Sequence, residues 1–199
     1  ILSQSTGLPT HSGDNLIEDG LSFDEVVRRL RYVNFVCPPG KCYNYQNVPY
    51  SLISNIVLKK SGITYEQYLE NKVLRPLGMR TATVGYADYA ANNNFAVPHL
   101  PTRKGWAPTT VTEHYYRVNP AAGVNASITD MSGWLLAHMG QNPSVLSPSI
   151  LNAVHAKITR NTNYYGSREG VTNSHYGLGW RVFDYRGDKN FVHHGGGVK

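Results

Sequence analysis

The sequence contains no long hydrophobic run. No stretch approaches 18 consecutive apolar residues, so no membrane-spanning helix is predicted, and no stretch has the layout of a signal peptide. The chain begins at Ile1 without a methionine and ends at Lys199, just after a run of glycines. We interpret both ends as cut, so the lack of a targeting segment carries little information about location.

Several kinds of functional site are also missing. The eight histidines are scattered, and no H-x-H or H-x-x-x-H spacing comes with a carboxylate partner, so we predict neither a metal site nor a cofactor. The G-x-S-x-G pentapeptide of triad hydrolases does not occur. The net charge of +6 would suit an anionic partner, but the densest basic group fits a solvated helix face better than a nucleic-acid site. That group consists of Arg28, Arg29 and Arg31.

The only two cysteines, Cys37 and Cys42, lie in the segment CPPGKC. No second pair of ligands stands at zinc-like spacing. A disulfide across the turn at residues 38–40 is geometrically reasonable, and closing so small a loop would stabilise the fold by roughly 2 kcal/mol. It would also indicate an oxidising compartment. The alternative, two unrelated thiols, stays open.

The composition, with 41% hydrophobic and 16% charged residues, is typical of a globular protein. Residues 1–21 are predicted to be loop, and residues 81–125 to be long loops with short strands. Helices are predicted where a capping residue precedes an apolar pattern. They run from Ser22 to about Arg31, 47–61 with Gly62 as C-cap, Thr64 to about Leu74, Ser127 to Gly140, and Ser147 to about Ile158.

Strands are predicted only near the end of the sequence. YGLGWRVFDY alternates as a strand would, Gly187-Asp188 indicates a hairpin turn, and NFVHHGG begins a second strand. Two strands alone do not make a stable sheet. We therefore expect further strands to pair with them.

Tyr45-Gln46-Asn47 is the most distinctive local segment whose side chains could take part in catalysis. It stands immediately before a predicted helix, and a tyrosine and an asparagine two positions apart on an irregular segment project to the same side. The Tyr45 hydroxyl could accept a proton if nearby cations lowered its pKa. Asn47 could hold an amide carbonyl or orient a neighbouring lysine. Taken alone, such a triplet is common by chance.

The second feature is His193-His194-Gly195-Gly196-Gly197. Adjacent histidines on a strand point to opposite faces, so they cannot easily bind one metal ion. The glycines would let a substrate backbone approach closely, and a backbone N–H there could serve an oxyanion hole. The alternative is a glycine-rich turn beside a surface histidine.

Six segments, in order, resemble motifs of class C β-lactamases and their relatives. LSQSTGLPTH is similar to the family's LL-x-HTSGLP stretch, PPGKCYNYQN to its PG-x(4)-Y-S/A-N signature, and RPLGMRTAT to its PLGM-x-x-T. AGVNASITDMSGW resembles GG-x-x-S-T-x-x-D-M/L, YGLGW resembles the strand entry YGLGW, and HHGGGVK resembles H/K-T/S-G-G. The match extends over nearly the whole chain.

The resemblance implies an α+β fold of the β-lactamase/transpeptidase type. It would have an antiparallel sheet flanked by helices plus a helical subdomain, with catalysis between them. The 199 residues would form one incomplete domain, with a helical subdomain at about 20–160 and strands at about 175–199. The implied activity is that of a serine hydrolase that forms an acyl-enzyme on β-lactams or related amides and esters.

The family's nucleophile is the serine of an S-x-x-K motif, and none of the eight lysines here has a serine three positions before it. We expect that motif upstream of Ile1, and the chain alone to be inactive. By position, Tyr45 would take the serine proton and Asn47 would bind the substrate amide. His194 would replace the lysine of the family's K-T-G motif. Gly196 would allow close approach, and Gly197 would donate an N–H to the oxyanion.

Two alternatives remain. A D-Ala-D-Ala carboxypeptidase or a carboxylesterase would share the chemistry up to the acyl-enzyme, so the sequence does not separate them from a β-lactamase. A non-catalytic interaction module of the same fold would explain the missing S-x-x-K. In every case the expected partner is a small molecule or peptide and not nucleic acid. The resemblance and the spacing of Cys37 and Cys42 favour a periplasmic or secreted bacterial location.

Overall fold

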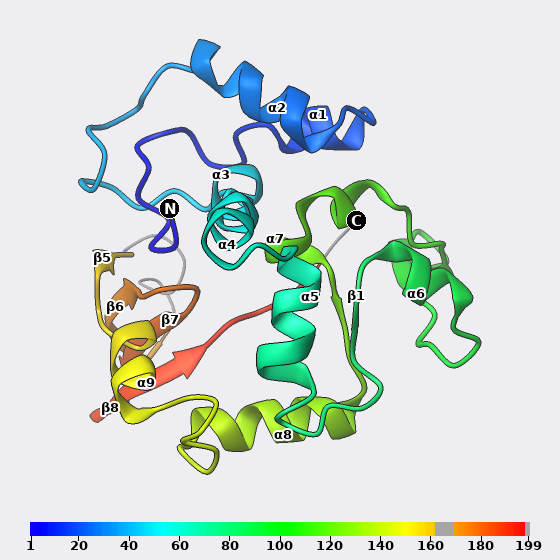
Figure 1. The fold of residues 1–199 in the computed structure, drawn as a ribbon. Coiled ribbons are helices and arrows are strands. Elements are labelled where there is room, and N and C mark those ends of the chain that lie inside the picture. Colours follow the sequence, from blue (N-terminus) through cyan, green and yellow to red (C-terminus); the bar gives the residue numbers. More distant parts are fainter. Residues whose placement is uncertain (162–168, 198–199) are drawn as a thin grey trace.

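The computed structural model describes residues 1–161 and 169–197. It combines helices with antiparallel sheets, as the α+β prediction requires (Figure 1). In Figure 1 the four-stranded sheet near the end of the chain lies on the left, the N-terminal helices lie at the top, and a long helix from the middle of the chain runs along the bottom. Among the described residues, no helix is long and apolar enough to cross a membrane.

The N-terminal region contains the helix α1 (Asp14–Glu18), the helix α2 (Phe23–Arg29) and the 3₁₀ helix η1 (Leu30–Tyr32). The predicted start at Ser22 is confirmed, because its side chain accepts a hydrogen bond from the Glu25 backbone N–H. The prediction of loop throughout residues 1–21 is wrong at α1. That helix is too short to display an apolar period, and a left-handed Gly13 with φ 89° introduces it.

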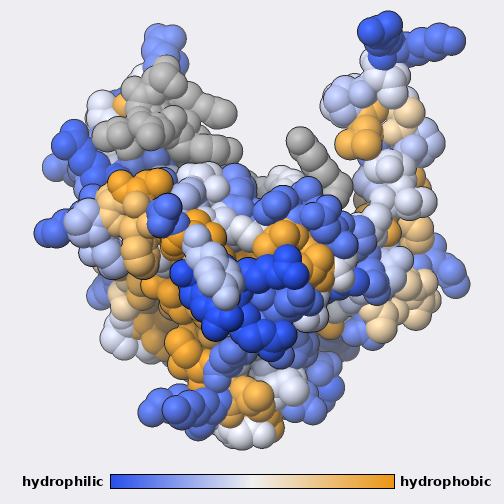
Figure 2. All heavy atoms as spheres, turned by 90° about the horizontal axis from the view of Figure 1, so that it is seen from above, coloured by the Kyte–Doolittle hydropathy of each residue, from blue (hydrophilic) through white to orange (hydrophobic). Residues whose placement is uncertain are grey.

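The basic residues of this region lie on a solvated helix face, as predicted. Arg28, Arg29 and Arg31 are exposed, and Arg29 forms an ion pair with Glu25 at 2.7 Å. Figure 2 shows largely hydrophilic residues over the face seen from above, interrupted by smaller hydrophobic areas.

The predicted helix over 47–61 is divided into α3 (Asn47–Ser51) and α4 (Ile53–Ser61). At the break, Leu52 bonds to the Pro49 carbonyl three residues back, at 3.3 Å. Gly62 caps α4 with a left-handed φ of 75°, as predicted. The next helix, α5 (Tyr65–Leu69), begins with a complete capping box at Thr64 and continues as the π-helical turn η2 (Glu70–Leu74).

Residues 81–125 contain short strands, as expected, and also helices that were not predicted. β1 (Thr83–Val84) pairs with β4 (Val124–Asn125), and β2 (His99–Thr102) pairs with β3 (Gly105–Pro108). The unpredicted elements are α6 (Tyr86–Ala91), the 3₁₀ helix η3 (His114–Val118) and α7 (Asn119–Ala122). These helices are short and α6 buries no residue, so their sequences carry little apolar periodicity.

The helix α8 (Ile128–His138) confirms the predicted capping box, because Ser127 and Asp130 bond reciprocally. The helix α9 (Pro148–Val154) begins after Ser147 as predicted but ends earlier than Ile158. It ends early because the chain joins the sheet there: the Ile158 backbone N–H bonds to the Tyr176 carbonyl at 3.2 Å.

The main sheet has the order β5-β6-β7-β8 and is antiparallel throughout. Its strands are β5 (Thr159–Arg160), β6 (Val171–Tyr176), β7 (Arg181–Tyr185) and β8 (Asp188–His193). The sheet therefore begins well before residue 175, where we expected it to begin. The strand β6 escaped prediction because VTNSHY is polar and has a register shift between Thr172 and His175.

The prediction of one continuous strand over YGLGWRVFDY is wrong in its first half. Tyr176 ends β6, and residues 177–180 form the turn into β7, with the Gly177 N–H bonded to the Trp180 carbonyl at 2.7 Å. A side chain at Gly177 would collide with the Val154 carbonyl, 2.5 Å from an ideal Cβ. The hairpin at Gly187, with φ 96°, agrees with the prediction.

Two small cores hold these elements together. The first is formed by fully buried side chains from α1, α2, α3 and η3: Ile17, Val26, Val48 and Val118. The second packs Leu74, Met79 and Ala82 against Trp134 of α8. Each fully buried aliphatic side chain contributes about 1.5–3 kcal/mol. The first core fixes α1 against the start of α3, which bear the polar side chains described next.

Candidate active site

A groove of about 1020 Å³ opens between the N-terminal segment, the start of α3 and the end of β8. It brings together the sequence-predicted residues Tyr45, Asn47, His194, Gly196 and Gly197. Residues not singled out in the sequence also line it, above all His11, Asp14 and Arg181. The chemistry-bearing segments predicted near position 45 and near position 194 therefore share one cavity.

Tyr45 is surrounded by aromatic rings and one cation. Its ring centroid lies 6.1 Å from that of His194 and 6.5 Å from that of Tyr176. The guanidinium carbon of Arg181 lies 5.7 Å from the Tyr45 centroid, and Arg181 is only 5% exposed. An arginine stays protonated at any physiological pH, so this side chain supplies a fixed positive charge beside the phenol ring.

Gln46 anchors the segment that carries Tyr45 and Asn47. Its side chain is fully buried; Nε2 donates to the Leu8 carbonyl at 2.6 Å, and Oε1 accepts from the Thr6 hydroxyl at 2.6 Å. The Gln46 backbone N–H donates to Gln4 Oε1 at 2.9 Å. Because the backbone at Gln46 is extended, Tyr45 and Asn47 point away from Gln46 and into the groove. Nothing in the sequence indicated this anchoring role, because the bonded partners lie about 40 residues away.

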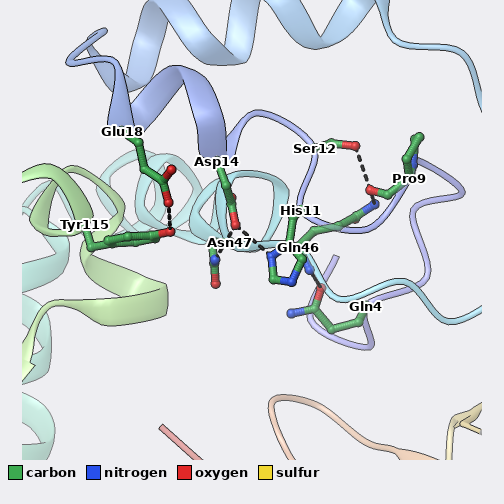
Figure 3. Close-up of polar contacts among 9 residues, drawn as sticks. All are labelled: Gln4, Pro9, His11, Ser12, Asp14, Glu18, Gln46, Asn47 and Tyr115. Atoms are coloured by element: carbon green, nitrogen blue, oxygen red, sulfur yellow. Dashed lines mark hydrogen bonds and ion pairs between the residues drawn. The ribbon is translucent and has the colours of Figure 1, made fainter. Parts of the chain in front are cut away.

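Asn47 is held by a carboxylate, as Figure 3 shows. Its Nδ2 donates to Asp14 Oδ2 at 2.7 Å, and the same oxygen lies 2.8 Å from His11 Nδ1. The Asp14 side chain is only 9% exposed, and burial raises its pKa although the hydrogen bonds from His11 and Asn47 act in the opposite direction. Nothing in the sequence connected position 14 to position 47, so this cluster was also missed.

Both ring nitrogens of His194 have hydrogen-bond partners. Its Nδ1 lies 2.6 Å from the Gly195 carbonyl, which can only accept, so Nδ1 carries the proton. Nε2 lies 3.0 Å from the Tyr176 hydroxyl and accepts from it. Burial, followed by the charge of Arg181, lowers the pKa of His194. Of the two adjacent histidines, His194 lines the groove and His193 does not.

The glycines after His194 form an open wall of the groove. An ideal Cβ built at Gly196 or Gly197 would meet no described atom within 4 Å. At Gly195 it would lie 4.0 Å from Arg181 Nη1, an ordinary contact. A side chain at these positions would therefore not collide with the described residues. The space beside them is available to a ligand.

Cys37 and Cys42 form a disulfide and lie outside the groove. In the part of the chain that the structure describes, no three histidine, cysteine, aspartate or glutamate side chains are grouped so that they could hold a metal ion. The groove is lined by phenols, two imidazoles, carboxylates, carboxamides, a guanidinium and backbone N–H groups.

A protein-family model described as Beta-lactamase matches residues 1–199. An unguisins hydrolase of Aspergillus campestris is 27% identical over 202 residues, which cover 98% of this chain and 37% of that relative. The chain thus spans little more than a third of this curated relative.

Solved structures share the fold. The octameric penicillin-binding protein homologue of Pyrococcus abyssi superposes with a TM-score of 0.78 at 22% identity, covering 94% of this chain and 43% of that one. A D-stereospecific amidohydrolase of Streptomyces sp. gives a TM-score of 0.73 at 17% identity, with coverage of 99% and 59%. The predicted β-lactamase/transpeptidase-like fold is confirmed.

Proposed function

This chain belongs to the β-lactamase family, whose model matches all 199 residues, and from that premise we propose that it forms the tyrosine and glycine-strand side of a serine hydrolase active site. The reaction is acyl transfer through an acyl-enzyme, on β-lactams or related amides and esters. The observation that carries the proposal is the single groove lined by Tyr45, Asn47, His194 and Gly197. The family's S-x-x-K motif does not occur in these residues, and the proposal takes the nucleophilic serine to lie outside them.

In the first half-reaction, the Tyr45 phenolate accepts the serine proton as the serine oxygen attacks the acyl carbon. The bond between the acyl carbon and the leaving nitrogen or oxygen then breaks, and the proton passes to that atom. Arg181, 5.7 Å from the Tyr45 centroid, supports this role because a nearby cation favours the ionised phenol. The Gly197 backbone N–H donates to the developing oxyanion, and Gly196 leaves room for the substrate backbone.

Asn47 binds the amide of the substrate. Because Nδ2 already donates to Asp14 at 2.7 Å, the Asn47 carbonyl oxygen is the atom offered to a substrate N–H. His194 takes the place of the family's lysine as the residue beside the substrate's anionic group. Its lowered pKa makes any attraction to that group depend on pH.

The family shares its chemistry up to the acyl-enzyme, so a D-Ala-D-Ala carboxypeptidase and a carboxylesterase remain the alternatives, and a non-catalytic module is the third. The similarity to an unguisins hydrolase and to a D-stereospecific amidohydrolase supports hydrolysis of an amide or ester bond. The disulfide between Cys37 and Cys42 supports an oxidising location such as the periplasm or the exterior.

Hydrolysis of nitrocefin, a p-nitrophenyl ester and a D-Ala-D-Ala peptide by the whole protein tests the proposal and separates the enzymatic alternatives. We expect turnover of at least one substrate and a covalent adduct of acyl mass on the intact protein. A failure to turn over any of the three, with no adduct, would favour the non-catalytic module. We also expect the 199-residue chain by itself to leave nitrocefin intact. Hydrolysis by that chain would show that the reaction does not need a serine outside it.

A further inference from the structure

His11 and Asp14 form a carboxylate–imidazole pair in the same groove. His11 Nδ1 lies 2.8 Å from Asp14 Oδ2, with the imidazole 57% exposed and the carboxylate only 9% exposed. A buried carboxylate that holds an accessible imidazole by Nδ1 is the arrangement that orients a histidine base in hydrolases. The steps proposed above give His11 no role, and they use Asp14 only to hold Asn47.

The backbone of His11 has an unusual conformation that neighbouring hydrogen bonds hold in place. His11 has a left-handed φ of 59°, which is uncommon for a residue with a side chain. Two backbone bonds hold it there: its N–H donates to the Tyr45 carbonyl at 2.8 Å, and its carbonyl accepts from the Asp14 N–H at 3.1 Å. Such conformations persist where the surroundings enforce them, and they cluster at active sites.

The pair also lies close to the proposed catalytic phenol. The ring centroids of His11 and Tyr45 are 5.8 Å apart, in an edge-to-face arrangement. Because the Asp14 carboxylate accepts the Nδ1 proton, Nε2 is left as the basic nitrogen of the neutral ring. A general-base role requires that Nε2 reach the acyl group of a substrate bound against Tyr45, directly or through one water.

We propose that His11 is the general base of the hydrolytic half-reaction, and that Asp14 is the residue that positions it. This inference rests on the proposed serine-hydrolase function. It assigns the two half-reactions to different bases: Tyr45 accepts the proton when the acyl-enzyme forms, and His11 accepts the proton when the acyl-enzyme is hydrolysed.

The step balances as an ester hydrolysis. The oxygen of a water forms a bond to the acyl carbon while His11 Nε2 accepts the water proton. The bond between the acyl carbon and the serine oxygen then breaks, and the serine oxygen recovers a proton from the imidazolium. The products are the free acid and the regenerated serine. Asp14 stabilises the imidazolium through its bond to Nδ1.

The test uses His11→Gly in the whole protein, with a p-nitrophenyl ester. Glycine suits the left-handed backbone at this position, so the variant should fold. We expect about one equivalent of p-nitrophenolate to be released rapidly, the acyl-enzyme to accumulate on intact-mass analysis, and steady-state turnover to fall at least about 10²-fold. Added imidazole should restore turnover in a saturable manner, which a purely structural role would not produce.

The matched control is His99→Gly, an exposed histidine outside the groove. It should keep normal turnover and show no response to imidazole. Combining Asp14→Asn with His11→Gly should raise the imidazole concentration needed for half-maximal rescue, because the carboxylate that holds the ring is gone.

Two outcomes would overturn the assignment while leaving the hydrolase intact. One is steady-state turnover of His11→Gly within twofold of the parent protein. The other is an equal loss of acylation and turnover without rescue by imidazole. If the parent protein itself forms no acyl-enzyme with any of the three substrates, the proposed function fails, and this inference fails with it.

Discussion

The rings of Tyr45 and His194 lie with their centroids 6.1 Å apart, although one residue precedes α3 and the other follows β8. Their proximity exists only because the helical region packs beside the sheet. Any substrate that fills the groove must meet both the phenol and the imidazole. Substitutions at the two positions should therefore change the same reaction, but in different ways.

Replacing Tyr45 by phenylalanine should slow acylation at least about 10²-fold, because the proposed proton acceptor is removed while the ring remains. The burst rate of p-nitrophenolate release by the whole protein measures this step. Tyr68→Phe, on α5 and outside the groove, is the matched control. An acylation rate within twofold of the parent protein would show that Tyr45 is not the acceptor.

His194→Ala should weaken turnover of carboxylate-bearing substrates more than that of neutral esters. Burial and Arg181 lower the pKa of His194, so its charged form, and hence this difference, should grow only as the pH falls below the ordinary histidine value of about 6.5. Arg181, Tyr176 and His193 are the groups around it that influence this titration. Comparing kcat/KM for both substrate classes from pH 5 to 8 measures the effect. Equal losses of kcat/KM for both substrate classes at every pH would show that His194 does not bind the anionic group.

Gln46→Ala should lower the free energy of unfolding by about 2 to 3 kcal/mol, because the Leu8 carbonyl and the Thr6 hydroxyl lose their buried partner. Activity should fall as well, since the flanking Tyr45 and Asn47 are no longer anchored. Urea unfolding of the whole protein measures the change, with the exposed Gln141→Ala as control. A loss no larger than that of the control would mean that Gln46 does not anchor the segment.

The His138–His155 pair should make stability depend on pH. The two imidazoles share a hydrogen bond of 2.9 Å, and burial together with His155 lowers the pKa of His138 to about 4. The unfolded chain takes up these protons near pH 6.5, so stability is full above that pH and is lost as the pH falls from about 6.5 toward 4.

The urea midpoint of the whole protein should therefore be lower at pH 5 than at pH 7.5, and His138→Gln should reduce that difference. His99→Gln, at an exposed position, should leave it unchanged. A pH-dependent loss of the same size in both variants would assign the effect to other groups, such as His194, whose pKa burial also lowers.

The helix starts at Ser22, Thr64 and Ser127 were predictable because a cap involves residues only three positions apart. The fold and the candidate residues Tyr45, Asn47 and His194 came from a resemblance spread over six motifs. The alternating pattern of YGLGWRVFDY misled us over its first half, because alternation alone does not exclude a turn. There a turn stands in the structure, because the chain must pass close to the Val154 carbonyl.

The sequence by itself therefore determined the family, the local caps and the chemical types available for catalysis. Only the tertiary structure decided which groups act together. Asp14 binds both His11 and Asn47, Gln46 is bonded to the N-terminal segment, and Arg181 lies beside the ring of Tyr45. The physical reason is that hydrogen-bond partners, burial and protonation states depend on distances between remote segments. Those distances exist only after the helices and the sheet have packed.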